Sequence, residues 1–108
     1  MNEITMEEFK RIDLRVAEVL EAKRVPGTDK LLELRIKIGE GTRTLVAGIA
    51  DGYTPEQLVG RKIVVVANLQ PRRLRGVESQ GMLLAANDGD RAVLLAPDRE
   101  VPSGARVS

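Results

Sequence analysis

The sequence has no cysteine, no histidine and no tryptophan, and Phe9 and Tyr53 are its only aromatic residues. Because cysteine is absent, the chain can form neither a disulfide framework nor a thiolate metal site. Because histidine is absent, the commonest general base and the commonest metal ligand are both missing. These absences favour a non-catalytic binding module over an enzyme, with no cofactor and no bound metal ion.

Long apolar runs are also missing. No segment approaches the roughly 20 apolar residues that a membrane-spanning helix requires. Residues 1–10 carry acids and lack the apolar stretch of a signal peptide. We therefore expect a soluble, cytoplasmic protein without a membrane partner. The length of 108 residues suits one domain, residues 1–108, whose small aliphatic core favours self-association.

The charge is nearly balanced overall but unevenly distributed along the chain. Five of the 17 Lys and Arg residues lie within residues 61–75, a segment that has no Asp or Glu. The rest of the chain contains the other 12 cations and all 16 acids, so it is net negative. A concentrated basic segment on a mildly acidic body is typical of a site for a polyanion such as a nucleic acid.

Capping signals predict two short helices. Thr5 and Glu8 form a capping box that begins a helix ending near Arg11. Thr54 is followed by a proline and, at the third helical position, by a glutamine, which is the same arrangement. Gly60 is expected to end this second helix.

Apolar residues at alternate positions predict a series of short strands. They cover a segment from residue 12 onward, then 32–38, 43–47, 62–67, 82–86 and 92–96, with a last short strand in the tail 101–107. In the first strand the alternation changes phase over residues 17–20, which indicates a β-bulge or a sharp bend. We predict an all-β oligonucleotide/oligosaccharide-binding (OB) fold: a five-stranded barrel with a short N-terminal helix, a helix between strands 3 and 4, and C-terminal extra strands. Another small barrel or a β-sandwich is the alternative.

Residues 68–82 join two predicted strands and are long for a hairpin loop, which indicates a functional or mobile segment. Pro71 and Gly76 bracket three arginines, so their charges lie on a shaped loop and not on a helix face. The planar guanidinium group matches phosphate oxygens. Neutral hydrogen-bonding groups for ribose, bases or phosphate come from Asn68, Gln70, Ser79 and Gln80.

The scarcity of aromatic residues restricts the partner of this loop. OB domains that hold single strands stack bases on aromatic rings, and one Phe and one Tyr cannot form such a platform. A folded RNA, recognised by its shape and its phosphates, is the better candidate, and its binding should weaken strongly with salt. The alternative interpretation is a solvated basic loop without any partner.

The segment Asn-Leu-Gln-Pro-Arg-Arg-Leu-Arg-Gly-Val-Glu-Ser-Gln-Gly-Met at 68–82 resembles the signature of the tRNA-binding domain family. That family includes free-standing tRNA-binding proteins and the C-terminal domain or separate beta subunit of methionyl-tRNA synthetases. Further matches occur along essentially the whole chain, at residues 13–16, 29–31, 48–50 and 101–105. The resemblance implies an OB fold, a homodimer, a grip on the outside of the tRNA elbow without anticodon reading, and a methionyl-tRNA synthetase catalytic subunit as a candidate partner.

The same resemblance implies a set of RNA-contacting residues. Carried onto this chain, they are Lys30, Asn68, Arg72, Arg73, Arg75, Ser79 and Met82. Many family members have Pro-Arg-Lys where this chain has Pro-Arg-Arg, so the charge is kept while a forked guanidinium replaces a point charge. Some relatives have an acid in place of Gln80.

Two other function classes remain open. A CsaA-like secretion chaperone, a branch of the same family, would need an exposed apolar groove for exported polypeptides. A carboxylate hydrolase could use Asp51, Asp88 and Asp90, although these aspartates beside glycines are better interpreted as turn formers. No glycine-rich phosphate loop is present, so no adenylation chemistry is expected. For a dimer, we expect an interface formed by the apolar C-terminal strands and by Ile4, Phe9 and Ile12.

Overall fold

The computed structural model of the chain describes residues 2–108, and strands make up most of its regular structure. In chain order the elements are α1 (Met6–Lys10), β1 (Leu14–Arg24), β2 (Leu32–Ile38), β3 (Gly41–Ala47), α2 (Pro55–Leu58), β4 (Lys62–Val66), β5 (Arg72–Leu74), β6 (Val77–Ser79), β7 (Met82–Leu83), β8 (Ala85–Asp88), β9 (Arg91–Leu94) and β10 (Arg106–Val107).

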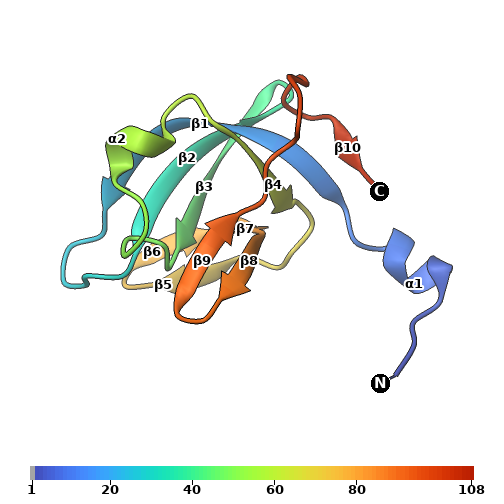
Figure 1. Cartoon of the computed structure of the whole chain (residues 1–108), viewed down its shortest axis with the longest axis horizontal. Helices are drawn as coiled ribbons and strands as arrows, with labels where there is room; N and C mark the ends of the chain where they lie inside the picture. The colour runs from blue at the N-terminus through green and yellow to red at the C-terminus, as the bar shows by residue number, and fades with distance from the viewer. Residues whose placement is uncertain (1) are drawn as a thin grey trace.

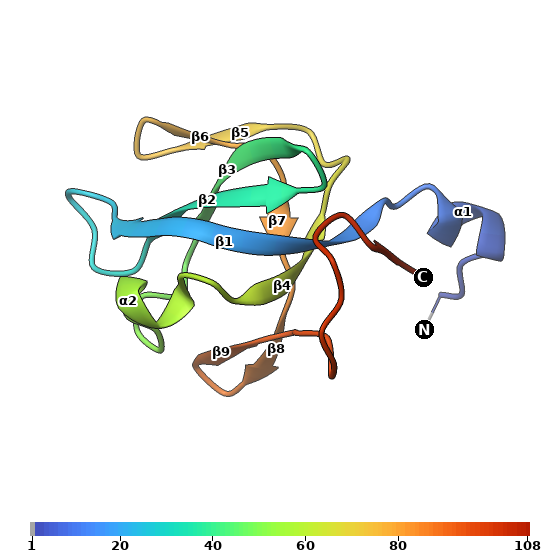
Figure 2. The ribbon, with the colours of Figure 1, turned by 90° about the horizontal axis from the view of Figure 1, so that it is seen from above.

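The central feature is a strongly curved antiparallel sheet with the strand order β3-β2-β1-β4-β7 (Figures 1 and 2). The sheet curls until β3 and β7, the two ends of this order, lie against each other. Helix α2 lies between β3 and β4 in the chain, and β10 adds to the first part of β1. The predicted all-β OB fold is therefore confirmed.

Strand β1 bends because it must pair with different neighbours along its length. Its first part pairs with β4 and β10, and its second part pairs with β2. The register with β2 shifts between Val19 and Glu21, which is the irregularity expected from the phase change in the sequence. A long bent strand of this kind lets one sheet close on itself.

The core is aliphatic and lies inside the curled sheet. Successive residues of a strand point to opposite faces, so alternate positions of β1 to β4 face inward. The largest fully buried side chains are Val19, Val25, Leu32, Leu34, Ile36, Leu45, Leu58, Ile63 and Val65. Tyr53 packs against this core, and its hydroxyl oxygen accepts a hydrogen bond from the Leu94 amide at 3.0 Å, which ties β9 to the segment before α2.

Both predicted capping boxes are present. The Thr5 hydroxyl accepts from the Glu8 amide and Glu8 accepts from the Thr5 amide, and Thr54 and Gln57 repeat the arrangement at α2. Helix α1 nevertheless buries none of its residues and lies outside the barrel (Figures 1 and 2). Both α1 and α2, the helices in the described part of the chain, fall short of the length and apolarity needed to cross a membrane.

Two segments differ from the strand predictions. The strand expected over 82–86 is two strands in different sheets, β7 and β8, separated at Leu84. The Leu84 amide donates to Val64 of β4, and its carbonyl accepts from Leu95, so the chain passes from the barrel to the β8–β9 hairpin at this residue. A continuous apolar run does not reveal such a change of partner. The second difference is the loop 68–82, which contains the hairpin β5–β6.

Candidate nucleic-acid interface

The basic hairpin, residues 72–79, consists of β5, a two-residue turn and β6. The turn residues Arg75 and Gly76 have φ values of 52° and 83°, and positive φ at both positions is the signature of a type I′ turn. This turn matches the twist of a two-stranded ribbon, and it places Arg75 at the tip. Only the glycine of the usual Asn-Gly pair is present, which is why the sequence signal for a hairpin is weak.

The three arginines of the basic hairpin are exposed to solvent. Among residues 2–108, the ion pairs join other cations to acids and leave these three out. Arg73 donates a hydrogen bond to the Gly76 carbonyl at 2.9 Å, which braces the turn. The side chains of Arg72 and Arg75 form no hydrogen bond within residues 2–108, so their guanidinium groups are available to an anion.

The end of the basic hairpin is fastened to the edge of the barrel. The Ser79 hydroxyl oxygen accepts from the Val46 amide at 3.0 Å and donates to the Gly81 carbonyl at 3.0 Å. Gln80 pairs with Thr44 in both directions: its amide donates to the Thr44 carbonyl at 2.8 Å, and its side-chain oxygen accepts from the Thr44 amide at 3.1 Å. These contacts give partners to β3, which would otherwise be an open edge of the sheet.

Gly81 completes this attachment by passing very close to β4. Its φ is +127°, and a Cβ atom built on it would lie 2.7 Å from the Val66 carbonyl oxygen. Only glycine tolerates both this backbone conformation and this approach. Each residue of the segment 79–81 therefore has a structural role. Ser79 contributes its hydroxyl, Gln80 its side-chain amide, and Gly81 the absence of a side chain.

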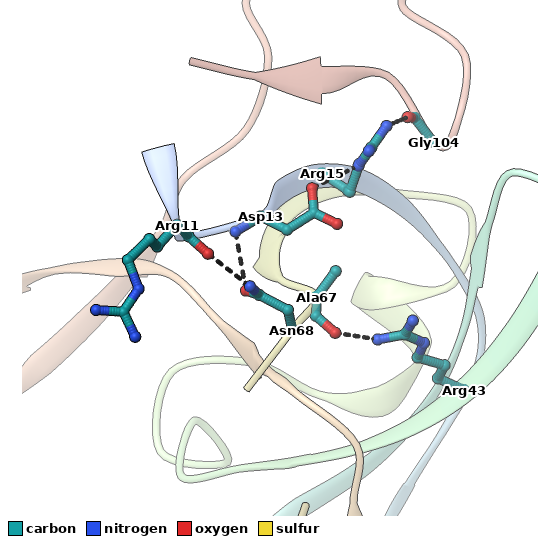
Figure 3. Close-up of polar contacts among 7 residues, drawn as sticks. All are labelled: Arg11, Asp13, Arg15, Arg43, Ala67, Asn68 and Gly104. Atoms are coloured by element: carbon teal, nitrogen blue, oxygen red, sulfur yellow. Dashed lines mark hydrogen bonds and ion pairs between the residues drawn. The ribbon is translucent and has the colours of Figure 1, made fainter. Parts of the chain in front are cut away.

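The start of the loop is fastened separately, at Asn68 (Figure 3). The Asn68 side-chain oxygen accepts from the Asp13 amide at 2.8 Å, and its side-chain nitrogen donates to the Arg11 carbonyl at 2.6 Å. Next to it, Arg43 donates from its guanidinium group to the Ala67 carbonyl. The basic hairpin is thus held by hydrogen bonds at both ends of the loop.

The structure brings only some of the predicted site residues together. Arg72, Arg73 and Arg75 share the basic hairpin. Ser79 is 3% exposed with its hydroxyl engaged on both sides, and Asn68 uses its amide on backbone groups. Both lie at the attachment points of the loop, away from its exposed tip.

Met82 and Lys30 lie elsewhere. Met82 begins β7 and is 41% exposed. Lys30 is exposed in the β1–β2 loop, which both Figure 1 and Figure 2 place at the same end of the barrel as the turn of the basic hairpin. Their RNA contacts stay predictions.

Sequence reasoning did not identify Arg43 as part of this arrangement. It occupies an inward-facing register position opposite Ile36, in phase with the buried Leu45. A charged residue on the apolar face of a predicted strand was the available signal, because such a group needs a specific partner. Of the aspartates considered for hydrolysis, Asp51 and Asp90 lie in turns, whereas Asp88 is the last residue of β8 and pairs with Arg91.

Comparison with known proteins places the chain in context. A family model described as "Putative tRNA binding domain" matches residues 14–106. Methionine–tRNA ligase of Thermotoga maritima is 57% identical over 107 residues, which is 99% of this chain and 17% of that protein. The corresponding ligase of Methanothrix thermoacetophila is 59% identical over 104 residues, 96% of this chain and 15% of that protein. The chain spans about a sixth of the length of these curated relatives.

Solved structures give the same fold over the whole length. A MetRS related protein from Pyrococcus horikoshii superposes with a TM-score of 0.94 at 41% identity and covers 100% of both chains. A chaperone CsaA from Bacillus anthracis superposes with a TM-score of 0.91 at 34% identity, covering 99% of this chain and 100% of that one.

Proposed function

Because the chain belongs to the tRNA-binding domain family, we propose that residues 1–108 act as one structure-specific, sequence-tolerant tRNA-binding domain in the cytoplasm. In this proposal the domain is a non-catalytic accessory to aminoacylation, of the methionyl-tRNA synthetase beta-subunit or C-terminal type. The observation that carries it is the basic hairpin: three exposed arginines outside the ion pairs of residues 2–108, on a ribbon fastened at both ends.

The chemistry of the basic hairpin favours recognition of the RNA backbone. Phosphate contacts fix orientation and carry no sequence information, which agrees with a sequence-tolerant role. The two aromatic residues are placed away from the hairpin: Phe9 is in α1, and Tyr53 packs on the core near α2. Base stacking therefore contributes little in this proposal, and the shape of a folded RNA sets the fit.

The first experiment is filter binding of unfractionated tRNA to the full chain over a salt series. We expect the logarithm of the association constant to fall linearly with the logarithm of salt concentration, by roughly 0.7–0.9 for each phosphate contact. Purified tRNAs of different identity should bind within a few-fold of one another. Binding that is insensitive to salt, or an equal preference for an unfolded polypeptide, would contradict the proposal and favour the chaperone role of the CsaA neighbours.

A second copy of the chain is the partner that we propose for the apolar surface. A groove beside β1 and the C-terminal segment is lined by apolar residues that include Leu14, Val64, Leu84, Leu95, Val101 and Val107. Ile4, Met6 and Ile12 are also exposed at and around α1, whereas Phe9 is half-buried. Exposed apolar patches of this kind mark interaction sites. A homodimer would cover them and present two basic hairpins to one RNA.

This dimer predicts the effect of a charge in the groove. Leu95 is 42% exposed, so Leu95→Glu should leave the barrel intact while placing a carboxylate in the interface. We expect a dimer for the unaltered chain and a monomer for the variant, measured by light scattering at micromolar concentration. Val59→Glu is the matched control because Val59 is 52% exposed at the end of α2, outside the groove lining. A monomeric unaltered chain would rule out the homodimer.

A further inference from the structure

Asn68 joins three parts of the chain that are distant in sequence (Figure 3). Its side chain holds the Arg11 carbonyl and the Asp13 amide, at the junction between α1 and β1. The Asp13 carboxylate in turn pairs with Arg15 at 2.7 Å, and Arg15 donates to the Gly104 carbonyl at 3.2 Å. One continuous set of hydrogen bonds therefore runs from the C-terminal segment through β1 to Asn68, the first residue of the loop 68–82.

We infer that Asn68 is a positioning residue. It serves tRNA binding by fixing the start of the loop 68–82 to the α1–β1 junction, without touching the RNA. The inference rests on the proposed function. It assigns to Asn68 a role different from the RNA contact that the family resemblance implies.

The geometry carries this assignment. Asn68 is polar and exposed, yet its side chain makes two short hydrogen bonds, at 2.8 and 2.6 Å, to backbone groups 55 and 57 residues away in sequence. The Ala67 amide also donates to the Asp13 carbonyl at 2.7 Å, so two successive residues dock on the same junction. A bidentate side-chain clamp between remote backbone segments is a device for holding them in one arrangement.

Only residues 69–71 separate this clamp from Arg72. When the clamp is present, only the short segment 69–71 connects the anchored Asn68 to Arg72. Little of the chain must therefore be ordered when RNA binds. When the Asn68 side chain is removed, the hydrogen bond from the Ala67 amide to the Asp13 carbonyl remains, but both side-chain hydrogen bonds to the junction are lost. RNA binding then has to order more of the chain, which weakens it without removing any phosphate contact.

The test is Asn68→Ala in the full chain, with unfractionated tRNA as the probe. We expect about tenfold weaker binding at every salt concentration, which is the cost of ordering roughly one additional backbone residue on binding. The slope of log affinity against log salt should stay unchanged, whereas Arg72→Gln should reduce it by roughly 0.7–0.9. In the RNA-free protein, hydrogen exchange should become faster at the amides of Asp13 and Ala67, which form hydrogen bonds across this junction. Unchanged affinity well below the melting temperature would overturn the inference.

A cross-linking cycle separates positioning from contact. The native chain has no cysteine, so Arg11→Cys with Leu69→Cys provides a unique pair for a short bis-maleimide cross-linker, on two residues that line the same hollow as Asn68. Asn68→Ala in this pair background should weaken binding about tenfold before cross-linking and have almost no effect afterwards, because the cross-link supplies the missing restraint. Persistent weakening after cross-linking would show that Asn68 touches the RNA and would overturn the inference.

Failure of the proposed function gives a different result. In that case the unaltered chain would bind tRNA weakly and without salt dependence, and Arg72→Gln would have no effect. Failure of the inference alone would leave both of those measurements as expected.

Discussion

Replacement of Arg72 by Gln together with Arg75 by Asn is expected to weaken tRNA binding by at least about 100-fold, because each lost charge-assisted hydrogen bond costs roughly 1.5–3 kcal/mol. The salt dependence should fall by about 1.4–1.8 in slope, the value for two phosphate contacts. These two arginines are chosen because Arg73 braces the turn through the Gly76 carbonyl. Asn suits positive φ better than Arg does, so Arg75→Asn removes a charge while favouring the turn.

The matched control is the double variant Arg91→Gln and Arg99→Gln, which changes the net charge by the same amount. Arg91 lies on the β8–β9 hairpin, on the opposite side of β1 from the basic hairpin (Figure 2), and Arg99 lies in the segment that follows β9. Both arginines form ion pairs with nearby aspartates. We expect a change of only a few-fold here, since it alters the general field and no direct contact. Equal losses in the two double variants would mean that net charge, and not the basic hairpin, governs binding.

Gly81→Ala is expected to have the largest effect on stability, a loss of about 3–5 kcal/mol in the free energy of unfolding. The added Cβ atom would lie 2.7 Å from the Val66 carbonyl oxygen and 3.4 Å from a Leu45 methyl group, at a φ of +127°. The conflict involves the backbone of β4, so a side-chain rotation cannot relieve it. Urea denaturation at a fixed protein concentration measures the loss, because the proposed dimer would make stability depend on concentration.

Gly27→Ala is the control for this effect. Gly27 also has positive φ, +84°, but a Cβ atom added there would meet nothing within 4 Å. Its substitution therefore carries the backbone strain alone, roughly 1–2 kcal/mol. The difference between the two variants reports the close approach to β4 together with the more strained φ of residue 81. If both had the same denaturation midpoint, the tight passage of residue 81 would not matter for the barrel.

Much of the fold could be predicted because local signals and tertiary structure agree. The capping boxes at Thr5 and Thr54 mark both helices, and the phase change near Val19 marks the bend in β1. These signals are local: each depends on residues within a few positions of one another. The break at Leu84 could not be predicted, because its two hydrogen-bond partners belong to β4 and to the segment after β9.

The candidate site shows the same limit more sharply. Composition and spacing identify the segment 68–82 and its arginines, since charge is visible in the sequence. The tasks of Asn68 and Ser79 depend on partners that are 55 and 33 residues away, so no local pattern separates a structural side chain from a binding one. A family motif contains both kinds of residue, because the residues that hold a site in shape and the residues that bind its ligand occur together in the members of the family.

The left-handed conformation of Arg75 has a consequence for any attempt to improve this protein. At this position Asn or Gly would be less strained, so a screen that selects for thermal resistance alone would discard the arginine. The resulting protein would be more stable and would have lost a positive charge from the tip of the basic hairpin. The small local strain at Arg75 thus marks a position where a substitution that raises stability would remove a charge proposed to bind RNA.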